Sequence, residues 1–153
     1  MKNKLKSYIS ILFWFFLLSE SINANESFIF NVTEIEILED GNQINGYKGG
    51  TATSMDGSII SAENFFYNKL TNILETSGNV KYFDKIKNII ITADKAIYLK
   101  NKEKIFTIGN SKAVNNNNTI TASNLNYDKI KNIYKAKKNV VVNDFERDTT
   151  IYA

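Results

Sequence analysis

One eight-residue phrase recurs three times in this 153-residue chain, at residues 60–67 (ISAENFFY), 91–98 (ITADKAIY) and 120–127 (ITASNLNY). The offsets between the copies are 31 and 29 residues. A second phrase keeps step with the first, as Gly78-Asn79-Val80, Gly109-Asn110-Ser111 and Lys138-Asn139-Val140. Self-similarity at a nearly fixed period indicates a fold built by repeating one small unit. We therefore expect function to be spread along the repeats.

The chain contains no Cys, no His and no Pro. This composition excludes a thiolate nucleophile, an imidazole base, a Cys/His zinc site and a disulfide framework. Metal binding through carboxylates alone stays open, although no EF-hand-like loop occurs. The acidic residues show no paired spacing suited to acid–base catalysis. We therefore predict that the protein is not an enzyme and has no catalytic residues, no metal site and no cofactor.

The first 24 residues have the three-part pattern of a secretory signal peptide. Lys2, Lys4 and Lys6 precede an apolar run at residues 8–18, and a small polar stretch ends at Ala24. The apolar run is shorter than the roughly 20 residues that span a bilayer. We predict a signal-peptide helix over residues 1–24, cleaved after Ala24, and an exported domain over residues 25–153. An uncleaved membrane anchor is the alternative.

Removal of the signal peptide leaves a nearly neutral chain. The whole sequence has 19 basic and 16 acidic residues, and residues 1–24 contain three lysines and one glutamate. The remaining 129 residues thus carry 16 basic and 15 acidic groups, a net charge of about +1. Because both signs are scattered along the chain, the sequence predicts no nucleic-acid partner.

Hydrophobic alternation predicts β-strands throughout the exported domain. Within each copy of the phrase the alternation slips by one residue, so that Ile91 and Ala93 fall on one parity and Ala96 and Tyr98 on the other. A strict strand would send the second pair to the opposite face. A bulge or bend would return both pairs to one side. We predict that bend at Glu63, Asp94 and Ser123.

Each phrase is followed by a polar hairpin tip and a returning strand. A lysine stands two residues after each repeated tyrosine, at Lys69, Lys100 and Lys129. We expect these lysines to be solvated turn charges rather than ligands of phosphate groups. The tyrosines Tyr67, Tyr98 and Tyr127 are expected to cap the edge of the sheet, with a place at its rim as the alternative.

The repeat extends towards both ends of the chain. A weaker copy begins at Phe30 and leads to Gly49 and Gly50. Ile151 falls 31 residues after Ile120, where another phrase would begin. We therefore expect the domain to be truncated at its C-terminus.

These residues carry a resemblance to a known family. The repeated Ile-[Ser/Thr]-Ala-[Asp/Glu]-x-x-x-Tyr unit, followed by Gly-Asn-Val after a hairpin, resembles the OstA-like domain of lipopolysaccharide transport. The resemblance covers roughly residues 27–153. It implies an all-β, open antiparallel β-jellyroll, in which two sheets form a V-shaped trough. It also implies that domains stack end to end and that lipid A acyl chains move along the apolar interior.

The alternation selects the residues that face the interior, and the resemblance implies that they line the lipid trough. Taken singly, each of them is better explained as ordinary sheet packing than as a lipid contact. The predicted residues are Ile60, Ala62, Phe65, Leu74, Val80, Tyr82, Ile91, Ala93, Ala96, Ile105, Ile120, Ala122, Val140 and Val142.

The resemblance leaves the choice of family member open. A bridge protein like LptA and the N-terminal domain of a translocon like LptD both fit, whereas the short apolar run argues against an LptC-like protein. The implied partners are lipopolysaccharide through its lipid A acyl chains, other OstA-like domains through edge strands, and the outer-membrane translocon. The implied location is the periplasm, at the outer membrane if the chain is LptD-like. The alternatives are a structural or adhesive secreted β-repeat protein without lipid cargo and, third, a glycosidase on a β-scaffold.

Overall fold

The structure is a computed structural model that describes residues 27–153, so the predicted signal peptide lies outside the described residues. This part of the chain is β throughout, apart from two 3-10 turns, η1 (Glu39–Gly41) and η2 (Lys100–Lys102). None of its helices is long and apolar enough to cross a membrane. The strands are β1 (Phe28–Leu38), β2 (Gln43–Ser54), β3 (Ile59–Ala62), β4 (Asn64–Asn68), β5 (Ile73–Asp84), β6 (Ile89–Leu99), β7 (Lys104–Val114), β8 (Asn118–Asp128), β9 (Ile133–Lys137), β10 (Val141–Asp144) and β11 (Thr149–Tyr152).

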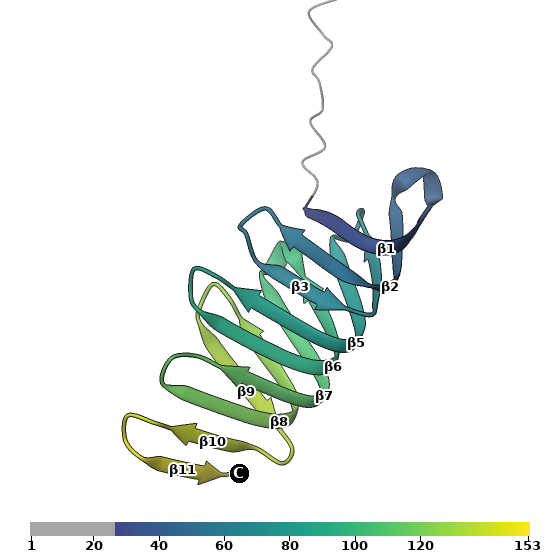
Figure 1. Ribbon diagram of the computed structural model, residues 1–153. Helices are drawn as coiled ribbons and strands as arrows, with labels where there is room; N and C mark the ends of the chain where they lie inside the picture. The colour runs from purple at the N-terminus through teal and green to yellow at the C-terminus, as the bar shows by residue number, and fades with distance from the viewer. Residues whose placement is uncertain (1–26) are drawn as a thin grey trace, which may run out of the picture.

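Every strand pairs antiparallel with its neighbours, in the order β1-β2-β3-β5-β6-β7-β8-β10-β11. Strand β4 pairs with β2 and β5, and β9 pairs with β8, so these two strands lie off that path. The long strands are stacked from the N-terminal to the C-terminal end of the molecule (Figure 1). The prediction of an all-β antiparallel fold is confirmed.

The sheet is folded into two walls, because each long strand contributes one half to each wall. The first wall contains β3, β10, β11 and the halves of the long strands that lie in the same layer. It comprises residues 28–32, 50–62, 80–93, 111–122 and 140–153. The halves that pair with β4 and β9 form the second wall, at residues 34–47, 64–77, 95–108 and 124–137. The turns of the first wall follow one another down the left side of Figure 1.

The walls meet at the bends that the sequence predicts. Glu63 separates β3 from β4, and the pairing of β6 with β7 breaks between Thr92 and Lys95, around Asp94. Ser123 lies between the half of β8 that pairs with β10 and the half that pairs with β9. The predicted bend is therefore confirmed in all three copies.

A one-residue mismatch between paired strands explains the slip in the alternation. Between β5 and β6, Ser77 pairs with Lys95 and Val80 pairs with Ala93. Two residues of β5, Gly78 and Asn79, thus oppose the single residue Asp94, which is the definition of a β-bulge. Both bulge residues have left-handed backbones, with φ of 80° and 48°. Because only one strand gains a residue, the inward residues of both strands stay on the same side after the bend.

The two repeated phrases bind each other at each bend. The Asn of the second phrase donates a side-chain hydrogen bond to the bend residue of the first phrase. These bonds join Asn79 Nδ2 to Glu63 Oε1 (2.6 Å), Asn110 Nδ2 to Asp94 Oδ2 (3.0 Å) and Asn139 Nδ2 to Ser123 Oγ (3.2 Å). The two phrases recur with the same period because each copy of the second phrase forms a hydrogen bond to the bend in the corresponding copy of the first phrase.

The side chains between the walls form one hydrophobic core. Phe28 contacts Tyr67 and Tyr98 edge-on, with ring centroids 5.1 and 5.7 Å apart. Tyr82 of the first wall meets Tyr98 of the second wall at 6.2 Å. The two walls therefore pack directly on each other in the middle of the molecule, so the trough is filled there by side chains.

A glycine at the bulge can be tested against a glycine in open space. In Gly109→Ala, the left-handed φ of +77° costs about 1–2 kcal/mol, and the new Cβ overlaps the carboxylate of Asp94. Gly57→Ala has a similar φ of +81° but no heavy atom within 4 Å of the new Cβ. We expect urea unfolding to show that Gly109→Ala loses more stability than Gly57→Ala, by about 1 kcal/mol or more. Equal losses would show that the contact with Asp94 does not shape the bend.

Candidate functional site

The interior between the walls contains most of the residues predicted to line the trough. Ile120 is partly buried against the core, and Val140 and Val142 are partly exposed. The other eleven are buried: Ile60, Ala62, Phe65, Leu74, Val80, Tyr82, Ile91, Ala93, Ala96, Ile105 and Ala122. These positions fit an inward-facing row in every copy. Contact of these residues with a lipid stays a prediction.

Within residues 27–153, the apolar interior ends in exposed residues at both ends of the sheet. At the C-terminal end, the inward row passes from buried Ile91 through Ile120 and Val142 to Ile151, which is exposed. At the N-terminal end, Ile37 lies on the inner side of β1, paired with the core residue Ile44, and is also exposed. Among the described residues, the interior thus forms a continuous apolar surface that reaches both ends of the sheet.

The repeated tyrosines hold the hairpin tips of the second wall. The ring of each tyrosine is buried, and its hydroxyl donates to the residue five positions later. The pairs are Tyr67 with Asn72 (2.8 Å), Tyr98 with Glu103, and Tyr127 with Asn132 (3.1 Å). Burial raises the pKa of Tyr98 and of Tyr127, so both hydroxyls remain neutral donors. The expected role of capping the edge of the sheet is therefore wrong, because the three tyrosines are core residues on strands that are paired on both sides.

Charged side chains close the side of the trough opposite the bends, which we call the mouth. The cross-wall cluster consists of Asp56 and Asp84 from the first wall and Lys100, Glu103 and Lys129 from the second wall. Lys129 Nζ lies 2.6 Å from Asp56 Oδ2 and 3.6 Å from Asp84 Oδ2. Lys100 Nζ lies 3.3 Å from Asp56 Oδ2 and also pairs with Glu103.

The prediction that the tip lysines are solvated is wrong for Lys100 and Lys129. Their side chains are only 14% and 13% exposed, because the turns of the opposite wall cover them. Burial of the Asp56 carboxyl opposes its ionisation. Hydrogen bonds from Lys129, Ser54 and Ser58 outweigh this effect, so the pKa of Asp56 lies well below its usual value. The Asp56 carboxyl at the mouth is therefore ionised at neutral pH.

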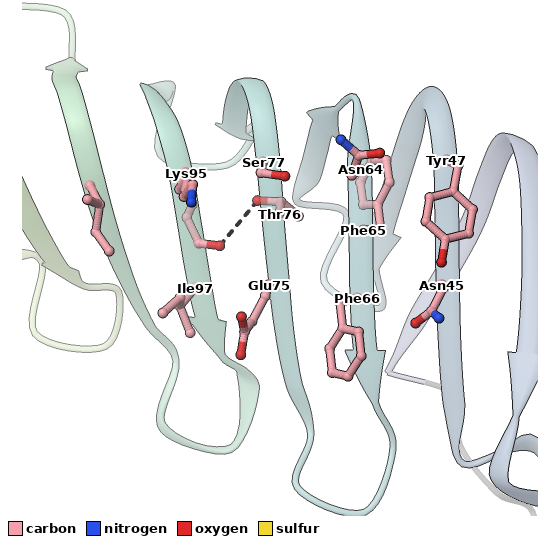
Figure 2. Close-up of a pocket in the computed structure, with 12 residues that line it drawn as sticks. Asn45, Tyr47, Asn64, Phe65, Phe66, Glu75, Thr76, Ser77, Lys95 and Ile97 are labelled. Atoms are coloured by element: carbon pink, nitrogen blue, oxygen red, sulfur yellow. Dashed lines mark hydrogen bonds between the residues drawn. The ribbon is translucent and has the colours of Figure 1, made fainter.

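A shallow depression of about 370 Å³ lies on the outer face of the second wall. Figure 2 shows the side chains that line it, which come from successive strands. Its apolar side chains include Tyr47, Phe66, Ile97 and Ile108. The sequence does not predict this depression, because these outward positions share no repeated residue type. Phe65 and Phe66 are neighbours on opposite faces of this wall and are 2% and 43% exposed.

The fold and the geometry of the interior match known proteins. The profile of a protein family described as OstA-like protein matches residues 29–148. The chain belongs to this family. The structure also resembles the crystal structure of LptH, the LptA homologous periplasmic component of the conserved lipopolysaccharide transport device from Pseudomonas aeruginosa.

That structural match has a TM-score of 0.66 at 13% sequence identity, and it covers 72% of this chain and 82% of the LptH chain. At this identity the match shows the fold, which is LptA-like. A search of curated proteins found no match. The assignment to the OstA-like family agrees with the prediction that the protein is not an enzyme.

Removal of one lysine from the cross-wall cluster should destabilise the protein. In Lys129→Met, the buried carboxylate of Asp84 and that of Asp56 lose their closest cation. Breaking a buried ion pair in this way costs about 3–5 kcal/mol. Lys129 is partly accessible, so we expect urea unfolding to show a loss of about 3 kcal/mol in the free energy of unfolding.

The matched control is Lys104→Met, because Lys104 pairs with Asp128 (3.3 Å) within one wall and at its surface. Its loss should stay below about 1 kcal/mol, and a similar loss in both variants would contradict the cross-wall role.

Proposed function

We propose that the protein is a periplasmic component of lipopolysaccharide transport, which shields the acyl chains of the lipid in the interior between its two walls. The observation that supports this most is the apolar inner face, which runs the length of the described domain and is uncovered at both ends. Such a surface fits a chain-like apolar cargo better than a compact ligand. The family and the LptA-like fold support the same function.

In this proposal, acyl chains enter when the walls part along the mouth. Side chains fill the middle of the interior, so the cargo must displace them or move the walls that carry them. Parting the walls separates Lys129 from Asp56 and exposes both to water. Because water hydrates the separated charges, two surfaces held together by ion pairs part more readily than two apolar surfaces of similar size. The cross-wall cluster would therefore give the trough a reversible closure.

The two ends of the sheet would join other OstA-like domains. Strands β1 and β11 are the terminal strands of the pairing order, and a terminal strand offers unpaired backbone groups to another chain. The uncovered apolar residues at each end would then continue into the next domain. We propose the outer-membrane translocon as a further partner. A bridge like LptA and the N-terminal domain of an LptD-like protein both remain consistent with this arrangement.

The alternative is a structural or adhesive β-repeat protein that carries no lipid. The filled middle of the interior is the observation that favours it, because a core without cargo needs no opening.

Adjacent phenylalanines on opposite faces provide a test that separates these functions. A photo-crosslinking benzoylphenylalanine at Phe65 faces the interior, and the same residue at Phe66 faces the outer depression (Figure 2). In cells that make lipopolysaccharide, we expect the Phe65 variant to capture it and the Phe66 variant to capture little. Capture can be read on immunoblots of the purified protein. Equal capture at both positions, or none at Phe65, would contradict transport through the interior.

A further inference from the structure

The same five-residue sequence, DKIKN, occurs at residues 84–88 and 128–132. The first copy is the turn between β5 and β6 in the first wall. The second copy is the turn between β8 and β9 in the second wall. The repeat period does not account for this identity, because the two turns lie in different walls and end different strands. Two equivalent turns thus stand on opposite sides of the mouth.

These two turns contact each other across the mouth. Lys87 Nζ of the first turn donates a hydrogen bond to the backbone carbonyl of Lys129 in the second turn. In return, Lys129 Nζ lies 3.6 Å from Asp84 Oδ2 of the first turn. The two copies therefore form a pair, and each supplies a lysine to the other.

Both turns project an isoleucine into the solvent. Asp84 Oδ1 accepts the backbone N–H groups of Ile86 and Lys87, and Asp128 Oδ1 accepts the N–H of Lys131. These bonds hold the turn tight at its first residue. As a result, Ile86 and Ile130 stand at the tips and are 82% and 73% exposed. Neither isoleucine belongs to the hydrophobic core, so the fold itself does not require an apolar residue there.

Other turns of the mouth add apolar tips of the same kind. Leu70, between β4 and β5, and Met55, between β2 and β3, are exposed as well. Single exposed apolar residues are normal on protein surfaces. Four of them on the tips of turns along one rim are a concentration that needs an explanation.

The charge of this rim is positive. The turns at residues 54–58, 68–73, 84–89, 99–103 and 128–133 contain seven lysines and four acidic residues, a net charge of +3. The turns nearer the ends are acidic: residues 38–43 contain Glu39 and Asp40, and residues 144–149 have one Arg against three acids. Met55, Leu70, Ile86 and Ile130 therefore lie on the basic turns, whereas the acidic turn at residues 144–149 carries one exposed apolar residue, Phe145. Although the sequence scatters its charges, the fold gathers these lysines on one side.

We propose that this rim docks on an anionic lipid surface, with Ile86 and Ile130 inserted between the headgroups and the flanking lysines bound to phosphate. Separate apolar tips that alternate with lysines suit the interface of a membrane, where apolar side chains enter the acyl boundary and cations meet the headgroups. A protein partner would instead favour one contiguous apolar patch with a packed centre. Docking at the rim would place the mouth of the trough against the membrane surface.

Vesicle binding by the exported protein, purified from cells after removal of the predicted signal peptide, tests the proposal. We expect the wild type to sediment with vesicles of phosphatidylglycerol and phosphatidylethanolamine and to leave vesicles of phosphatidylcholine unbound. The double variant Ile86→Ser/Ile130→Ser should bind the anionic vesicles at least about tenfold more weakly, since two inserted side chains are lost. The matched control, Ile29→Ser/Ile108→Ser, removes two exposed isoleucines from the outer faces of the walls and should bind like the wild type.

A charge variant and a salt titration complete the test. Lys85→Gln/Lys131→Gln should weaken binding to the anionic vesicles, and added salt should weaken binding of the wild type. The proposal is wrong if the wild type ignores anionic vesicles, if the tip variant binds like the wild type, or if the control loses as much as the tip variant. Because the vesicles contain no lipopolysaccharide, these outcomes are independent of the crosslinking result at Phe65. Thermal unfolding of each variant verifies that the fold is intact.

Discussion

The fold depends on the bulge at which two residues of one strand oppose a single residue of its neighbour. Without this mismatch, the alternation of β6 would place Ala93 and Ala96 on opposite faces of the sheet. With it, each strand turns from one wall into the other and keeps its apolar residues inside. The left-handed backbone of Gly78-Asn79, and of its counterparts, makes the bulge possible. The hydrogen bond from the asparagine to the bend residue holds it in place.

The bend also determines how the opposite side of the molecule is closed. Because the two walls meet along the line of bends, they must either separate or pack together along the mouth. Here the turns of the two walls meet through lysines and carboxylates instead of apolar side chains. Charges at this position hold the walls together in water and are rehydrated when the walls part. Under the proposed function, the same sequence forms a packed core and keeps a side that can open.

The alternation of apolar and polar residues was enough to predict the bends and most of the buried residues, because both follow from the order of residues along a strand. The cross-wall cluster could not be predicted in this way. Lys129 and Asp56 are 73 residues apart, and their meeting depends on the angle between the walls. The sequence shows only that Lys129 belongs to a polar turn, for which solvation is the ordinary expectation. The partial exposure of Val140 and Val142 likewise follows from their place in the last strands, where few neighbours cover them.

The central claim is that the walls part along the mouth to admit lipid, and the distance between the walls measures this directly. The chain has no cysteine, so spin labels can be attached specifically at Met55→Cys in the first wall and Lys102→Cys in the second wall, both exposed and beside the cluster. Double electron–electron resonance with added lipopolysaccharide should show a longer distance than without it. A pair within the second wall, Lys102→Cys and Lys131→Cys, should stay unchanged. An unchanged cross-wall distance in protein that has bound lipopolysaccharide would contradict the account.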